Sequence, residues 1–450
     1  MLRRRLLFAI TSCFSERNII NVYCLISSYN NLHGHLKETK CINTMQMEEE
    51  TKKVKLNDEE KTKQHTKRKK ITVPNKQHVS DPTQSINSDM SNVCPKEYMK
   101  SLGINTDVLQ LIDEEAAAKY VSLIIKDLLK NTCFVAEINP GFGIVTKRLL
   151  EAGVPLIHLY EARKDFHPIL EKIQSIYPDR MNVRNFNLVN IGQLLYRDRH
   201  TGGNQVQENV LQNVENKKWE DESCMQIVGA TNSSAFFRHL INSLIFQTSL
   251  MSNGRPVFYI MIPPSFWHKY TCDISNGKIY TSLKVMFQTM FHYEHLGTVD
   301  RKAFLPSARQ KKTSSKHKYN STFDEKLRED YKHMYVIKLE PRSDLYSLLT
   351  KKDWIVFWYF VRHHMRKRSN RLIPDLEKWA PGCGIKLIAK NYTIFTQFGD
   401  LTPTQILEVF KEFKSWPEYR ESYFLGSMGD SLSTFNEPAL LDFKFLQMDE

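Results

Sequence analysis

The chain has 450 residues, of which 41% are hydrophobic and 25% are charged, so it can bury a sizeable core and we expect two domains with tails. Lysine and arginine outnumber aspartate and glutamate by 63 to 50, and the net charge of +13 favours a polyanionic partner, with nucleic acid as the first candidate. This composition excludes a fibrous protein. No stretch reaches the roughly 18 consecutive apolar residues of a membrane span, so no membrane partner is expected.

The cysteines and histidines give no sign of a metal site. The eight cysteines are scattered without a C-x-x-C pair, so reduced thiols are expected and a zinc site or a disulfide scaffold is not. His292 and His295 flank Glu294, and His363 precedes His364, but neither spacing brings three ligands together. No Ser-His-Asp arrangement can be read from the spacing either.

Residues 1–44 are predicted to be a mitochondrial presequence. The first 40 residues include three consecutive arginines and only Glu16 and Glu38 as acids, and an arginine-rich, acid-poor composition is typical of such segments. The alternative is a secretory signal, because "RRR" is followed by the apolar run "LLFAI". Import is favoured, because that run is shorter than a usual signal core and basic composition continues past it.

Residues 45–95 are polar, without a hydrophobic period, and are predicted to be a disordered basic linker. The segment "KTKQHTKRKK" from Lys61 to Lys70 concentrates its positive charge. Two interpretations remain open: a solvated tail, or an arm that contacts nucleic acid or a protein partner.

Residues 96–345 show alternating strand and helix patterns. The first predicted helix lies within 111–129, with Asp113 as its N-cap and Glu114 and Glu115 in its first turn. Strands are predicted at 133–138, 155–161, 181–186, 224–230, 256–262 and 333–342, helices at 144–152, 164–177 and 234–251, and a polar insertion at 199–218. This alternation predicts an α/β fold with a doubly wound, Rossmann-like sheet.

The stretch "CFVAEINPGFGIVTKRLLEAG", residues 133–153, predicts a nucleotide-type cofactor site. Gly141 and Gly143 follow the first strand, where glycines let the backbone approach a ligand, and Glu161 ends the second strand, where an acid can accept bonds from ribose hydroxyls. The complete G-x-G-x-x-G spacing is absent, so a purely structural tight turn stays open as the alternative.

The same stretch resembles the first motif of the rRNA adenine N6-dimethyltransferase family, E-I-G-P-G-x-G-x-L-T, and "LID" at 111–113 resembles the F-L-x-D lead-in of that family. Asn139 stands at the first glycine, as in the mitochondrial transcription factor B branch. The segments "DLYSLLTKKDWIVFWYFVRHHMRKR" and "FGDLTPTQILEVFKEF" are similar to the small helical domain of the second paralogue of that branch. The resemblance covers roughly residues 98–423.

The resemblance implies an S-adenosylmethionine-dependent methyltransferase fold over 96–345 and a C-terminal helical domain over 346–450. It also implies that S-adenosylmethionine is the methyl donor and that Asn187 replaces the acid beside its adenine. The residues expected to bind the donor are Leu111, Glu137, Asn139, Gly141, Gly143, Glu161 and Asn187.

The loop that would hold the methyl acceptor departs from the family pattern. Family members carry an N-L-P-Y type loop after the fourth strand, whose polar groups hold the target amine while the aromatic ring stacks on the flipped base. This chain has "IVGATNSSAFF" there, without the proline or the aromatic residue, and Asn232 lies two residues beyond the aligned position. We therefore assign no catalytic residue and expect donor binding with weak or lost methyl transfer.

Two basic tracts are candidates for nucleic-acid contact. One is "ARQKKTSSKHKY", with Lys311 and Lys312, and the other is "RHHMRKRSNR", which follows the aromatic helix "DWIVFWYFV". The candidate residues in the second tract are Arg366, Lys367, Arg368 and Arg371. The aromatic residues are expected to form core rather than base-stacking platforms. A solvated basic face is the alternative to a strand-binding rim.

Together these features predict a transcription initiation factor of the mitochondrial matrix nucleoid. The resemblance implies that its partners are the mitochondrial RNA polymerase and promoter DNA, especially the melted single strand. The rival hypothesis is a mitochondrial small-subunit rRNA adenine N6-dimethyltransferase, for which rRNA is the partner. A structural RNA-binding protein of the mitochondrial ribosome is also compatible with the charge.

Overall fold

The computed structural model describes residues 108–275, 279–307 and 329–433. The predicted presequence and linker, together with Lys311 and Lys312, lie outside the described residues. The domain boundaries proposed from the sequence remain predictions. Within the described ranges, no helix combines the length and the apolar character that crossing a bilayer requires.

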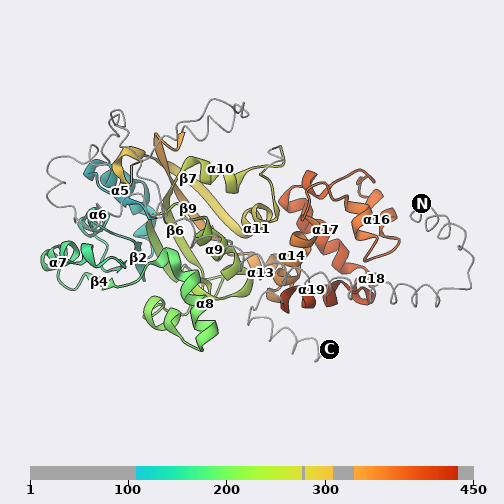
Figure 1. Ribbon diagram of the computed structural model, residues 1–450, viewed down its shortest axis with the longest axis horizontal. Helices are drawn as coiled ribbons and strands as arrows, with labels where there is room; N and C mark the ends of the chain where they lie inside the picture. Colours follow the sequence, from blue (N-terminus) through green and yellow to red (C-terminus); the bar gives the residue numbers. More distant parts are fainter. Residues whose placement is uncertain (1–107, 276–278, 308–328, 434–450) are drawn as a thin grey trace, which may run out of the picture. The chain divides into compact units, whose positions relative to one another are not determined.

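A seven-stranded sheet in the order β4-β3-β2-β5-β6-β9-β7 forms the centre of the α/β part (Figure 1). Its parallel strands are β2 (Val135–Ile138), β3 (Ile157–Tyr160), β4 (Met181–Arg184), β5 (Met225–Ala230) and β6 (Pro256–Ile262). The chain moves outward from β2 through β3 to β4 and then returns to place β5 on the other side of β2. The predicted doubly wound fold is therefore confirmed, and its topological switch point lies between β2 and β5.

Two antiparallel strands complete the sheet. β9 (His333–Pro341) pairs with β6, and β7 (Phe291–Asp300) pairs with β9. Strand β7 was not predicted, because "FHYEHLGTVD" buries only Phe291 and Val299 and a register shift between His295 and Gly297 interrupts its alternation.

Helices cover both faces of the sheet, and two hydrophobic clusters lie beneath them. One cluster joins α5 (Glu114–Leu128), α6 (Ile144–Glu151) and α7 (His167–Ile176) to the sheet. The other joins α8 (Ile191–Thr201), α9 (Ser234–Phe246), α10 (Pro264–Thr271) and α11 (Ser282–Met290) to the opposite face. Neighbouring residues of β2 alternate between the clusters, since Val135 belongs to the first and Ala136 to the second.

Local structure confirms one prediction from the sequence and corrects another. Asp113 caps α5 as predicted, because its Oδ1 accepts a hydrogen bond of 2.7 Å from the backbone N of Ala116. The segment 199–218 is not a wholly polar insertion, since the π-helical turn Val206–Val210 buries both of its valines against α8. Isolated valines in a polar stretch have no periodicity, so the sequence could not place them.

The C-terminal part consists of helices in the described residues: α13 (Leu345–Leu348), α14 (Lys351–His364), α15 (Leu372–Leu376), α16 (Cys383–Ile388), α17 (Pro403–Ser415), α18 (Pro417–Glu421) and α19 (Phe424–Ser433). Trp354, Phe357 and Phe360 of α14 are buried, as expected for core aromatics.

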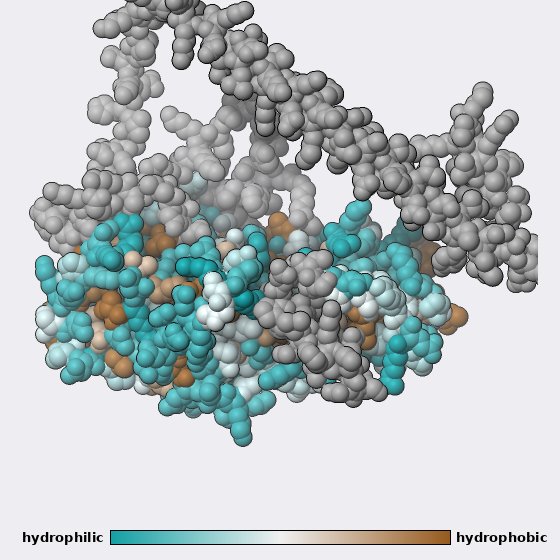
Figure 2. All heavy atoms as spheres, turned by 60° about the horizontal axis from the view of Figure 1, so that its bottom comes forward, coloured by the Kyte–Doolittle hydropathy of each residue, from teal (hydrophilic) through white to brown (hydrophobic). Residues whose placement is uncertain are grey.

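The hydrophobic cluster on the α9 side of the sheet continues into this helical part, so the α/β part and the helical part share one apolar core. Figure 2 shows hydrophilic residues over much of the described surface in that view, with hydrophobic residues in scattered spots.

Candidate donor-binding site and nucleic-acid interface

The turn between β2 and α6 has the backbone geometry that brings a ligand close. Gly141 has φ +54° and Gly143, the N-cap of α6, has φ +69°, both in the left-handed region that favours glycine. A Cβ on Gly143 would lie 2.3 Å from Cδ1 of Ile173, so this glycine also lets the turn pack against α7. Asn139 begins the turn with φ +47°, which asparagine tolerates better than most residues.

Glu161, directly after β3, lies against this turn. Its Oε2 accepts a hydrogen bond of 3.1 Å from the backbone N of Gly141, and its Oε1 accepts one of 2.8 Å from the backbone N of Arg163. The side chain is 1% exposed, and burial raises its pKa while the two backbone donors oppose that rise. Each carboxylate oxygen can accept a second hydrogen bond, which is the kind of bond that a ribose hydroxyl donates.

Glu137 provides a second buried carboxyl group close to the first. Thr146, on the first turn of α6, donates a hydrogen bond of 2.6 Å from its hydroxyl to Oε2 of Glu137. Burial, and to a lesser extent the charge of Glu161, raises the pKa of Glu137 to about 8. Two carboxyl groups in one buried site resist joint ionisation, so Glu137 is largely protonated near neutral pH.

Gln110 is a site residue that the sequence analysis missed. It lies on β1 (Gln110–Leu111), which pairs with β8 (Phe304–Leu305), and its amide covers the glycine turn: a Cβ on Gly141 would lie 1.9 Å from Oε1 of Gln110. The only available signal was its position directly before Leu111. Gln110 Nε2 and Asn139 Nδ2 are both buried without a hydrogen-bond partner among the described residues.

The two unpaired N–H donors show which kind of ligand the site fits. Leaving a buried N–H group unpaired costs about 1–3 kcal/mol, so the turn favours a ligand that carries acceptor oxygens. The amino-acid carboxylate of S-adenosylmethionine is such a group, and its ribose supplies hydroxyl donors for Glu161. The residues of this turn therefore fit S-adenosylmethionine.

Leu111 and Asn187 complete the predicted set. Leu111 is buried beside Gln110 on β1. Asn187 follows the carboxyl end of β4, is half-buried, and caps the 3-10 turn Leu188–Asn190 by accepting a hydrogen bond of 3.0 Å from the backbone N of Val189. The fold thus gathers Leu111, Glu137, the Asn139–Gly143 turn and Glu161, while Asn187 lies at the end of the neighbouring strand.

The loop after β5 is closed by its own hydrogen bonds. The hydroxyl of Thr231 accepts a bond of 3.1 Å from the backbone N of Ser233, and the hydroxyl of Ser233 caps α9 by accepting a bond of 3.3 Å from the backbone N of Phe236. Thr231 and Ser233 are buried, whereas Asn232 between them is half-buried. Two of the three side chains in this loop are therefore used to shape its backbone.

The basic residues after α14 fall into two groups. Arg366, Lys367 and Arg371 are exposed. Arg368 is half-buried, and its Nη2 donates a hydrogen bond of 2.9 Å to the carbonyl oxygen of Ile274, while its guanidinium lies 5.9 Å from the ring centroid of Tyr280. Arg368 thus joins the helical part to the α/β part, and its predicted contact with nucleic acid stays a prediction, as do those of the other basic residues.

A doubly wound sheet with a glycine turn after β2 and a buried acid after β3 is typical of proteins that bind a nucleotide-type cofactor, and S-adenosylmethionine-dependent methyltransferases are one such class. Within that class, the family model for ribosomal RNA adenine dimethylase matches residues 104–415, so the chain belongs to this family. The family is S-adenosylmethionine-dependent, which confirms the cofactor predicted from the sequence.

The chain is similar to proteins named "Dimethyladenosine transferase 2, mitochondrial". The Drosophila melanogaster protein is 34% identical over 378 residues, covering 74% of this chain and 82% of the relative. The Homo sapiens protein is 25% identical over 264 residues, covering 54% and 62%. Among solved structures, the 23S rRNA methyltransferase ErmE has 15% identity and a TM-score of 0.44, covering 68% of this chain and 99% of that one. A Plasmodium falciparum dimethyladenosine transferase has 13% identity and a TM-score of 0.43, covering 68% and 97%.

Proposed function

We propose that this chain is a mitochondrial transcription initiation factor that works with the mitochondrial RNA polymerase and stabilises the melted strand of promoter DNA. The observation that carries the proposal is the loop Thr231–Ser233, which lacks the proline and the aromatic residue of the family's acceptor loop and uses its hydroxyls to shape its own backbone. The fold is that of a methyltransferase, but the residues that would hold a target base are replaced.

The consequence for methyl transfer follows from geometry. Transfer requires the target amine to be held in line with the methyl group, and correct positioning of reactants supplies about 7–11 kcal/mol in favourable cases. Without an aromatic platform for the flipped base and a polar clamp for its amine, most of that contribution is lost. The donor turn, by contrast, keeps the hydrogen bond between Gly141 and Glu161, and Gly143 remains the N-cap of α6.

The basic residues support the strand-binding part of the proposal. Arg366, Lys367 and Arg371 are exposed on the segment that connects α14 to α15, and the whole chain carries a net charge of +13. Exposed lysines and arginines along one segment can track the phosphates of a single strand. These three residues together are called the basic rim below.

Localisation to mitochondria, in the matrix nucleoid, belongs to the same proposal. The similar proteins of Drosophila melanogaster and Homo sapiens are both named mitochondrial. The arginine-rich, acid-poor composition of residues 1–44 favours the same compartment.

A second candidate function is methylation of adenine in mitochondrial small-subunit rRNA. Membership in the ribosomal RNA adenine dimethylase family and the preserved donor turn favour it. Under this alternative, RNA would be the polyanionic partner. The two candidates differ in whether Asn232 alone can hold a target adenine.

Reconstituted transcription decides between the candidates. Promoter-dependent transcription with the cognate polymerase is expected to require the full chain, and to continue when S-adenosylmethionine is omitted. A parallel reaction with an rRNA hairpin and labelled donor should yield no dimethyladenosine. Efficient methylation without any stimulation of transcription would overturn the proposal in favour of the rRNA enzyme.

A further inference from the structure

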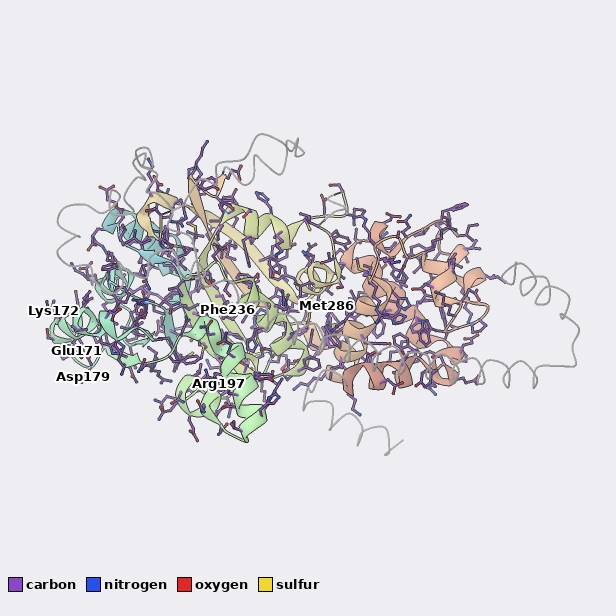
Figure 3. All side chains as sticks on the ribbon, viewed as in Figure 1. Glu171, Lys172, Asp179, Arg197, Phe236 and Met286 are labelled. Atoms are coloured by element: carbon purple, nitrogen blue, oxygen red, sulfur yellow. The ribbon has the colours of Figure 1, made fainter. Side chains whose placement is uncertain are left out.

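A cavity of about 390 Å³ lies where α14 of the helical part meets α9 and α11 of the α/β part. Its lining combines arginines, aromatic rings and one amide; these residues are Arg238, Ile241, Asn242, Phe246, Ser282, Leu283, Met286, Trp358 and Arg362. Figure 3 shows Met286 on α11, on the side of the α/β part that faces the helical part. No acidic residue occurs among the described residues that line this cavity.

The inner wall of the cavity is apolar and aromatic. Ile241, Phe246 and Met286 are buried, and the ring of Trp358 lies 5.6 Å from that of Phe246 at an interplanar angle of 72°. Trp358 is only partly buried, so part of this side chain is accessible to a ligand. A flat heterocyclic ring would bind favourably in this cavity, since stacking on an aromatic side chain contributes about 1–3 kcal/mol per base.

The polar residues of the lining point to a phosphate-bearing ligand. The guanidinium of Arg362 lies 5.2 Å from the ring centroid of Trp358, and Arg238 is exposed on α9. Asn242, one turn after Arg238 on the same helix, supplies both a donor and an acceptor. A base with hydrogen-bonding edges matches the amide, and an adjacent phosphate matches the arginines.

The cavity and the basic rim are close to each other along the chain. Arg362 is in the last turn of α14, and the basic rim begins at Arg366, four residues later. Arg238 lies in the second turn of α9, which begins at Ser234. A strand whose phosphates lie on the rim can therefore place one base in the cavity.

We propose that this cavity binds one unpaired nucleobase of single-stranded DNA, with Trp358 stacking on the base, Asn242 bonding to its edge and Arg238 contacting a neighbouring phosphate. The proposal deepens the proposed function, on which it rests for the presence of a melted strand. It is distinct from the donor turn at Gly141 and from the loop Thr231–Ser233, because none of those residues lines the cavity.

The test compares a short fully abasic DNA strand with the same strand carrying a single 2-aminopurine. The full chain should bind the one-base strand roughly tenfold more tightly, because one stacked base contributes that much affinity. The fluorescence of 2-aminopurine should be quenched on binding. An abasic background is useful because the strand can slide until its only base reaches the cavity.

Three variants locate the effect. Trp358→Leu and Asn242→Ala should each remove most of the tenfold advantage while leaving the affinity for the abasic strand unchanged. Arg238→Ala, a change at an exposed residue, should weaken both strands and flatten the dependence of log affinity on log salt by about 0.7. Arg420→Ala is the matched control for Arg238→Ala, since it removes one exposed arginine of α18 from outside the cavity and should leave the affinity for both strands and the salt slope unchanged.

The possible outcomes distinguish a failure of the base-binding cavity from a failure of the proposed function. Equal affinity of the full chain for the two strands would overturn the base-binding cavity while leaving strand binding by the rim, and thus the proposed function, in place. An advantage seen only with the matching RNA strands would overturn the DNA proposal and favour the rRNA candidate. Failure to bind any DNA strand would contradict both base binding in the cavity and the proposed stabilisation of the melted strand.

Discussion

At the scale of single residues, Glu161 is the side chain whose loss we expect to weaken donor binding most. Both of its oxygens are already held by backbone N–H groups, so the carboxylate has one orientation before any ligand arrives. Glu161→Ala should abolish the heat of S-adenosylmethionine binding in isothermal titration, because charge-assisted bonds to the ribose are lost. A variant that binds the donor with unchanged affinity would contradict this assignment.

Thr146 provides a control for that experiment. Its hydroxyl donates a hydrogen bond to Glu137 rather than to Glu161. Thr146→Val should therefore weaken donor binding less than Glu161→Ala does.

Glu137 is expected to make the stability of the folded chain depend on pH. Its pKa is about 8 in the folded chain against an ordinary value of 4.5, so between these values the folded state binds more protons than the unfolded state. Its contribution to stability is therefore complete below pH 4.5, is lost progressively as the pH rises, and is gone above about pH 8. Glu137→Gln should unfold with a urea midpoint that falls less steeply over this window than that of the unchanged protein. Parallel pH profiles for the two proteins would show that Glu137 does not carry the effect.

At the scale of elements, the segment between α14 and α15 combines exposed charge with one anchoring residue. Arg368 bonds to the carbonyl of Ile274, whereas Arg366, Lys367 and Arg371 are exposed. Electrostatic binding of DNA can thus be tested separately from the contact between the helical and α/β parts, by replacing the residues of the basic rim and keeping Arg368.

Replacing Arg366, Lys367 and Arg371 together by alanine should weaken single-stranded DNA binding on every sequence alike. Each phosphate contact contributes about 0.7 to the slope of log affinity against log salt, so loss of three contacts should flatten that slope by roughly two. Fluorescence anisotropy over a salt series measures both quantities. An unchanged slope would identify the rim as a solvated face, and the linker residues Lys67–Lys70 would become the better candidates.

Arg368→Ala serves as the comparison for the rim. It should lower the melting temperature, because a hydrogen bond between the two parts is lost, at a cost of about 1 kcal/mol. Its effect on the salt slope should be smaller than that of the rim variant.

At the scale of the whole molecule, one apolar cluster extends from the sheet into the C-terminal helices. Phe360 of α14 is fully buried in it and its ring lies near those of Phe398, Phe410 and Phe413. Because the two parts share this core, we expect them to unfold together.

Phe360→Ala should destabilise the whole chain by about 3–5 kcal/mol, the usual cost of truncating a buried phenylalanine. Circular dichroism and tryptophan fluorescence should report one coincident transition at a lower denaturant concentration. Ile385→Ala is the control, since Ile385 is 79% exposed in the same helical part and its truncation should change little. Two separate transitions in the Phe360 variant would show that the parts fold independently.

The sequence by itself determined the features that depend on local chemistry. Apolar runs and a helix cap predicted β2, β6 and α5 close to their observed bounds, because the pattern of polar and apolar residues in such elements follows the period of their own backbone. The glycines at 141 and 143 and the acid at 161 predicted the donor turn, because each of these positions requires a particular residue type.

Only the tertiary structure decided the features that depend on distant neighbours. Gln110 lies over Gly141 because β1 pairs with β8, nearly 200 residues away in the chain, and no local pattern encodes such a pairing. Arg368 differs from Arg366 and Lys367 through distant neighbours, namely the carbonyl of Ile274, the ring of Tyr280 and the carboxylate of Asp400. The cavity between α9, α11 and α14 exists only because two parts of the chain share a core, and shared burial is a property of packing that sequence periodicity does not record.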